Sequence, residues 1–145
     1  MAKYGPFLYG GLKINGVDLS NRVESLTLDL TKNDIDLMAM GDGGHVHTPS
    51  LEDDKITANF WQDYSAPGSN SVDATLMPIF QAGTAVAYEV VPDTRVAISA
   101  TNPLYSGSVV LEAYQPVNGK VGDGLQTQVT FQGQGTVTRA TSGTF

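Results

Sequence analysis

The sequence VESLTLDLTKNDIDLMAMGDGGHVHTPSLEDDKITANFW (residues 23–61) has a strand pattern at each end. Leucine occupies positions 26, 28 and 30 near its start, and apolar residues occupy positions 56, 58 and 60 near its end, with polar residues between them. Strict alternation is typical of a strand with one buried and one exposed face. We therefore expect two early strands, 23–30 and 55–61, whose connection is too long for an ordinary hairpin loop.

The connecting segment, residues 31–54, shows no convincing helix or strand period. Loops of this length without secondary structure are uncommon in compact domains and are usually functional or disordered. This one is not composed like a disordered linker, because apolar residues lie among its acids and glycines: Ile35, Leu37, Met38, Met40, Val46 and Leu51. Apolar residues on a projecting loop indicate a surface that contacts a partner. The alternative is a loop that folds back on its own core.

Composition indicates one strand-rich domain over residues 1–145. The chain is 41% hydrophobic and only 16% charged, and its 16 glycines suit strands and turns better than a helical bundle. Cysteine is absent, so disulfides and thiolate metal sites are excluded. We expect neither a signal peptide nor a membrane span, since no long apolar run occurs.

The net charge of −7 is unevenly distributed. Residues 1–50 carry six acids and four bases, residues 51–100 seven and two, and residues 101–145 two of each. Nucleic-acid binding needs clustered lysine and arginine, so direct gripping of DNA or RNA is not expected.

The remaining segments predict more short strands and one helix. Strands are expected at 12–14, 84–91, 96–98, 105–114 and 126–132, the last continuing through 136–139 after a glycine bend. Apolar residues at 72, 76, 79 and 80 predict a helix, with Ser71 as its N-cap, a kink near Pro78 and an end by Gly83. The predicted fold is mainly β: a β-sandwich or flattened barrel with one flanking helix, an N-terminal arm (1–11), a long projecting loop (31–54) and a C-terminal tail (140–145) that is mobile unless a neighbour holds it.

Residues with chemical potential are scattered. His45 and His47 lie on one side of an extended segment and are candidate metal ligands with Asp42 or Asp53, but nothing fixes a third ligand. A solvated pair of histidines is the alternative that we prefer. The sequence contains neither a nucleophile elbow nor a complete calcium loop. We expect a protein that is not an enzyme and has no catalytic residue, no metal site and no cofactor.

Several phrases spread along the chain resemble the major tail, or tail tube, proteins of bacteriophages with long non-contractile tails. These are AKYGPFLYGG (2–11), VDATLMP (72–78), AISATNPLYSG (97–107), VGD (121–123) and TVTRAT (136–141). The resemblance implies a structural virion protein, made in the host cytoplasm, that forms hexameric rings stacked into a hollow tube. DNA passes through such a tube to the host without specific binding. The implied partners are further copies of the chain, a tape-measure protein and tail-terminator or tail-tip proteins, with no membrane.

In that family, terminal arms and long loops bridge subunits within and between rings. The candidate contact residues in the N-terminal segment 1–11 are therefore Tyr4, Phe7 and Tyr9. Those in the long loop 31–54 are Ile35, Leu37, Met38, Met40, Val46 and Leu51. We also expect an acidic lumen, over which DNA slides because like charges prevent adhesion. Its candidates are Asp34, Asp36 and Asp42. Two alternatives remain open at this stage: a capsid decoration protein, and a carbohydrate-binding β-sandwich module with exposed aromatic rings.

Overall fold

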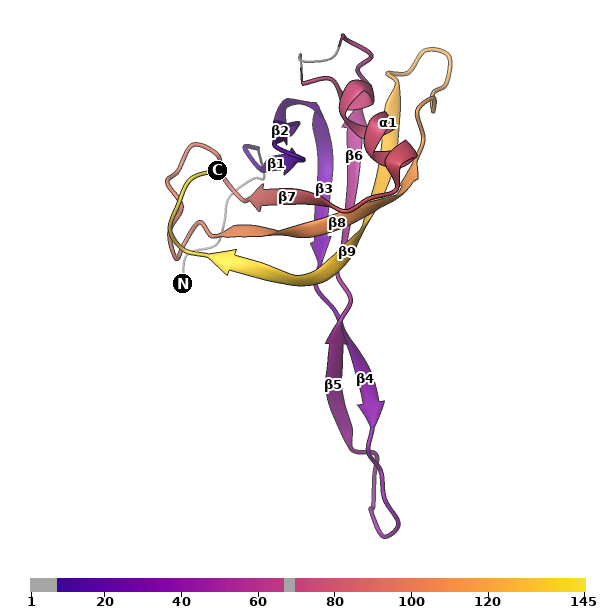
Figure 1. Cartoon of the computed structure of the whole chain (residues 1–145), viewed down its shortest axis with the longest axis vertical. Helices are drawn as coiled ribbons and strands as arrows, with labels where there is room; N and C mark the ends of the chain where they lie inside the picture. The colour runs from indigo at the N-terminus through magenta and orange to yellow at the C-terminus, as the bar shows by residue number, and fades with distance from the viewer. Residues whose placement is uncertain (1–7, 67–69) are drawn as a thin grey trace.

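The structure, a computed structural model, describes residues 8–66 and 70–145. These residues form nine strands, one α-helix and a single 3₁₀ turn at Ser20–Arg22 (Figure 1). In chain order the elements are β1 (Gly11–Ile14), β2 (Val17–Asp18), β3 (Val23–Asp29), β4 (Lys32–Asp36), β5 (His47–Glu52), β6 (Lys55–Trp61), α1 (Val72–Ala82), β7 (Val86–Val91), β8 (Leu104–Tyr114) and β9 (Gln126–Ala140). No helix among the described residues is long and apolar enough to cross a membrane.

Seven strands form one antiparallel sheet in the order β2-β1-β7-β8-β9-β6-β3. The sheet curls into a half-barrel, so that β3 and β6 run across the direction of β7 and β8 (Figure 1). The predicted mainly β fold with one flanking helix is confirmed. β9 makes the curl: its first half pairs with β6 up to Gln132, while it pairs with β8 from Val129 to Ala140. The glycine bend predicted after residue 132 lies inside this one long strand.

Gly133 is required at that bend. A β-carbon on Gly133 would lie 2.9 Å from the backbone oxygen of Asp54, closer than real side chains approach. Its own amide donates a 2.7 Å hydrogen bond to the same oxygen. Gly135 follows with a φ of 84°, a conformation that favours glycine. The two glycines thus let β9 leave β6 and continue along β8.

The concave side of the sheet holds the core, which α1 helps to close. The alternating residues predicted to be buried on residues 55–61, Ile56, Ala58 and Phe60, are all buried. α1 begins at the Ser71 cap and ends at Gly83, as predicted, and Gly83 adopts the left-handed conformation. The helix buries Val72, Leu76 and Ile79, but Phe80, predicted on the same apolar face, is 44% exposed. The Tyr114 hydroxyl of β8 donates a 2.8 Å hydrogen bond to Asp73, which fixes the first turn of the helix to the sheet.

Residues 96–98 do not form the predicted strand. They belong to a connection between β7 and β8 that is organised by Asn102, whose side chain is fully buried. Its amide nitrogen donates to the backbone oxygens of Asp93 and Val96, each at 2.9 Å, and its Oδ1 accepts from the Asp93 amide at 3.1 Å. One side chain therefore replaces the hydrogen bonds that a strand partner would have supplied.

We expect the substitution Asn102→Ala to destabilise the domain by at least about 2 kcal/mol, because it leaves buried backbone groups without partners. Thermal or urea unfolding measures the change. Asn118→Ala is the matched control, since Asn118 makes only an exposed hydrogen bond to Gln115. Equal stability of the two variants would contradict the organising role of Asn102.

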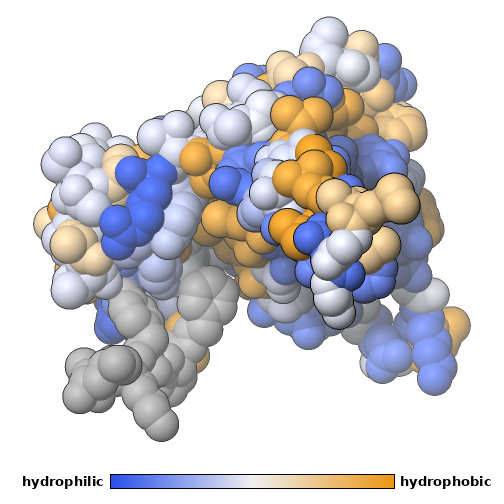
Figure 2. Space-filling model, turned by 90° about the horizontal axis from the view of Figure 1, so that it is seen from below, coloured by the Kyte–Doolittle hydropathy of each residue, from blue (hydrophilic) through white to orange (hydrophobic). Residues whose placement is uncertain are grey.

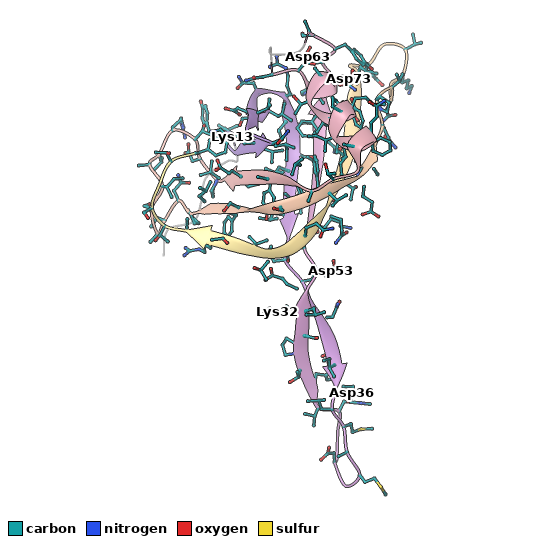
Figure 3. All side chains as sticks on the ribbon, in the orientation of Figure 1. Lys13, Lys32, Asp36, Asp53, Asp63 and Asp73 are labelled. Carbon is teal, nitrogen blue, oxygen red and sulfur yellow. The ribbon has the colours of Figure 1, made fainter. Side chains whose placement is uncertain are left out.

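The end of the chain folds back on the start of the sheet. The Phe145 ring lies against Gly11, and the Lys13 ammonium lies 4.5 Å from the centre of that ring. Figure 3 shows Lys13 in this part of the sheet. The tail predicted to need a neighbouring molecule is thus held by β1 of its own chain.

Candidate functional site: the projecting arm

Residues 31–54 form a two-stranded ribbon that projects from the half-barrel (Figure 1). We call this segment the arm. The prediction of a loop without regular structure is wrong here, because the ladder of the core continues outward. Asp29 is paired with Lys55 in β3–β6, and Lys32 is paired with Glu52 in β4–β5, in the same register. The Asp53 amide donates to the Thr31 oxygen at 2.8 Å between these pairs.

The arm has one polar and one apolar face. Residues directly opposite each other in an antiparallel pair lie on the same face. Ile35 is opposite Thr48, and the Leu37 amide donates to the Val46 oxygen at 2.6 Å, which continues that register toward the tip. The apolar face thus carries Ile35, Leu37 and Val46. The polar face carries Asp34, Asp36, His45 and His47.

Two histidine–aspartate pairs organise the polar face. His45 Nδ1 lies 2.8 Å from Asp36 Oδ2, and His47 Nδ1 lies 2.5 Å from Asp34 Oδ2. The two imidazole centres are 5.9 Å apart. The side chains are largely exposed, and no group of three potential ligands able to hold a metal ion occurs within residues 8–66 and 70–145. The pairs therefore act as cross-strand ties of the ribbon.

All six apolar candidates of the arm are exposed, from Ile35 at 42% to Met40 at full exposure. The structure therefore excludes the alternative in which residues 31–54 fold back on their own core. Seen from below, with the arm pointing toward the viewer, orange apolar and blue hydrophilic residues lie side by side (Figure 2). Exposure of this kind on a ribbon without a covering element is typical of an interaction surface.

The other candidate residues lie in different places. Asp42 is at the tip, where its carboxylate accepts a 2.7 Å hydrogen bond from the Ala39 amide. Tyr9 lies beside the connection that follows β7, with the Arg95 guanidinium 3.6 Å from its ring centre, and it remains 44% exposed. Tyr4 and Phe7 lie outside the described residues.

The root of the arm is attached to the bend of β9. Glu52 accepts a 2.8 Å hydrogen bond from the Val137 amide, and the Gln132 side chain donates to Asp53 Oδ1 at 2.5 Å and to the Asp54 backbone oxygen at 3.1 Å. These bonds fix the direction in which the arm leaves the sheet. Figure 3 shows Asp53 at this junction, with Asp36 farther along the arm. The run Glu52-Asp53-Asp54 gave no signal of this role, because adjacent acids usually indicate a solvated surface.

A second apolar surface lies at the open mouth of the half-barrel. It is a groove of about 300 Å³, lined by the three alternating leucines of 26–30 and, across the mouth, by Val90, Pro92 and Tyr105. The leucines predicted to face the core therefore only partly do so. Leu30 remains half exposed at the root of the arm.

A curled sheet with one helix and a projecting ribbon defines the structural class of this chain. No protein-family model and no curated protein matches it. Several solved structures, by contrast, are similar to this chain. The first is the tail of an empty gene transfer agent particle, determined with C6 symmetry, at a TM-score of 0.68 and 12% identity over 94% of this chain and 98% of that one.

Two further structures are similar. The virion of a native gene transfer agent particle gives a TM-score of 0.69 at 11% identity, covering 96% of this chain and 99% of the other. The tail tube of SPP1 gives 0.70 at 11% identity, covering 92% and 76%. The chain therefore has the fold of these phage tail tube proteins, as its sequence phrases indicated, and these neighbours are structural components of tails rather than enzymes.

Proposed function

We propose that this chain is a tail tube subunit, which polymerises as stacked hexameric rings into a virion conduit for DNA. The observation that carries the proposal is the arm: two strands of the core sheet continue outward as a ribbon whose apolar face is exposed and is covered by none of the described residues. The fold shared with tail tube proteins supports it, as does the C6 symmetry of one such tail. No enzymatic role is proposed.

The sheet edges supply the contacts within a ring. β2 and β3 end the sheet on its two sides, and their outer hydrogen-bonding groups have no strand partner among the described residues. Exposed edges invite pairing with another chain, and head-to-tail pairing that closes on rotation removes every free edge. We propose that the edges join neighbours within a ring and that the apolar face of the arm reaches the next ring.

The polar face then remains for the lumen. Asp34, Asp36 and Asp42 would line the tube and let DNA slide past, because the acidic surface repels phosphate. Tyr9 and the N-terminal residues Tyr4 and Phe7 would contact adjacent subunits. A tape-measure protein inside the tube and terminator or tip proteins at its ends complete the proposed set of partners.

Electron microscopy of the purified chain over a concentration series, with light scattering alongside, tests the proposal. We expect rings or tubes with a central hole. A monomer at every concentration, which also fails to extend preformed tail tips, would contradict it. Binding to capsids would then favour a decoration protein. Binding to a glycan panel would favour a carbohydrate-binding module, for which Trp61, 44% exposed beside Asn118 and Lys120, would be the stacking ring.

A further inference from the structure

Asp54 is an unusual residue at the root of the arm. Its side chain is only 3% exposed, yet neither carboxylate oxygen has a hydrogen-bond partner with good geometry. An ionised carboxylate in such a place is costly, because burial removes its water without replacing it. The group is therefore expected to carry a proton more readily than an ordinary aspartate.

The surroundings of Asp54 point the same way. Burial, together with the neighbouring Glu52 carboxyl, raises the pKa of Asp54 to about 6. The Thr31 amide opposes this rise, while the charge of Asp53 adds to it. The neighbouring Asp54 carboxyl, followed by the hydrogen bond from the Val137 amide and by the charge of Lys32, lowers the pKa of Glu52. Of the two carboxyls, Asp54 is therefore the one that holds a proton, while Glu52 is ionised.

The other elements at the root add no compensating positive charge. From β7, burial and the charges of Asp54 and Glu52 raise the pKa of Tyr88 to about 12, so this residue stays neutral. From β9 come the Gln132 side chain and the backbone amides of Gly133 and Val137, which do not titrate. Within residues 8–66 and 70–145, the cation that acts on the pair is Lys32, through Glu52, on the exposed surface of β4.

The same Glu52 carboxylate is the point at which β5 is tied to β9, through the Val137 amide. Loss of the Asp54 proton adds a buried negative charge close to the negative charge of Glu52. Glu52 is the more exposed partner and is free to swing into water, but this movement breaks its bond to Val137. The direction of the arm then depends on the backbone bonds of Asp53 and Asp54 alone.

We propose that Asp54 and Glu52 form a proton-operated latch, which fixes the arm against β9 when Asp54 is protonated and loosens it when that proton is lost. The proposal rests on the proposed function in one respect: a fixed arm is preorganised for docking, so polymerisation is stronger when the latch is closed. The latch itself is a property of the single chain and is measured without any assembly.

The direction of the pH effect follows from the raised pKa. Asp54 titrates near 3.8 when solvated in the open state and near 6 in the closed state, so protonation favours closure. The stabilisation is complete below the lower value and is lost as the pH rises to about 6, after which opening levels off. The population of the open state therefore increases about tenfold between pH 5 and pH 7.5. We use this pH range because it lies above the isoelectric point of the protein.

Hydrogen exchange of the Val137 amide, corrected for its intrinsic rate, tests the latch in the full chain. We expect protection to fall about tenfold from pH 5 to pH 7.5. Asp54→Asn cannot ionise, so its protection should change less than about twofold. Glu52→Gln removes the opposing charge and should reduce the pH dependence as well, which keeps the test decisive if one variant folds poorly. Asp42→Asn at the tip is the matched control and should behave like the wild type.

The outcomes separate the two proposals. Protection that is independent of pH, or equal pH dependence in Asp54→Asn and the wild type, overturns the latch even if tubes form. Normal latch behaviour in a chain that never polymerises overturns the tube function and leaves the latch intact. If calcium or magnesium restored the protection of the amide at pH 7.5, against a chelator control, a bound cation rather than the Asp54 proton would close the latch. That result would overturn the proposal.

Discussion

We expect the double substitution Ile35→Asn and Leu37→Asn to abolish polymerisation while leaving the folded monomer intact. Both side chains are exposed in the single chain, at 42% and 55%, and they are neighbours on the apolar face of the arm. Because each side chain is already about half buried, covering the rest of it in a contact between rings contributes about 0.7–1.5 kcal/mol, so losing both weakens every contact by roughly 10–10²-fold. Sedimentation and electron microscopy at concentrations where the wild type assembles measure the effect.

The control for this experiment lies on the same strand. Asp34→Asn together with Asp36→Asn places the same two asparagines on the opposite face, where we propose that the side chains face the lumen. This variant should assemble like the wild type, because each asparagine keeps a side-chain oxygen that can accept the hydrogen bond from His45 or His47 and so preserves the cross-strand ties. Thermal unfolding of both monomers checks that neither loses its core. If the control alone failed to assemble, the polar face would be the contact surface and the proposed orientation of the arm would be wrong.

The arm also shows where prediction from sequence stops. Alternation identified the strands at 23–30 and 55–61 because each has one face that is more buried than the other, and this difference is what creates a period of two. β4 is exposed on both sides and no residue of β5 is fully buried, so the core imposes little of that period on them. An extra residue in β5, between the Lys32–Glu52 and Asp34–Pro49 pairs, also shifts its alternation relative to β4. Their apolar and acidic residues therefore looked unpatterned.

Residues whose positions depend on long-range contacts could not be identified from the sequence either. The segment 96–98 has strand-forming residues, but the Asn102 side chain donates hydrogen bonds to the surrounding backbone oxygens, so the segment does not pair with another strand. Asp54 lies in a run of three acids, and only its position beneath the bend of β9 makes it buried. By contrast, the helix was predictable to its last residue, because a cap, an apolar stripe and a terminal glycine are all local signals.

Phe131→Ala should cause the largest loss of monomer stability of any single change considered. The ring is fully buried in β9, opposite Ile56 of β6 on one side and Leu111 of β8 on the other. It therefore lies where the sheet curls, between strands that no other element can bring together. Removing a buried phenylalanine ring costs about 3–5 kcal/mol, from lost burial and from the cavity that remains. Unfolding in urea should show a lower midpoint.

Phe80→Ala provides the comparison, since it deletes the same ring from the outer side of α1, where the side chain is 44% exposed. Its cost in the monomer should stay below about 1 kcal/mol. A domain of this size has a total stability of about 5–15 kcal/mol, so Phe131→Ala removes a large part of it and should lower the melting temperature by roughly 10–20 °C. Equal losses in the two variants would show that the curl does not depend on Phe131. In that case the groove and the arm would be held by the strand ladders rather than by the core beneath them.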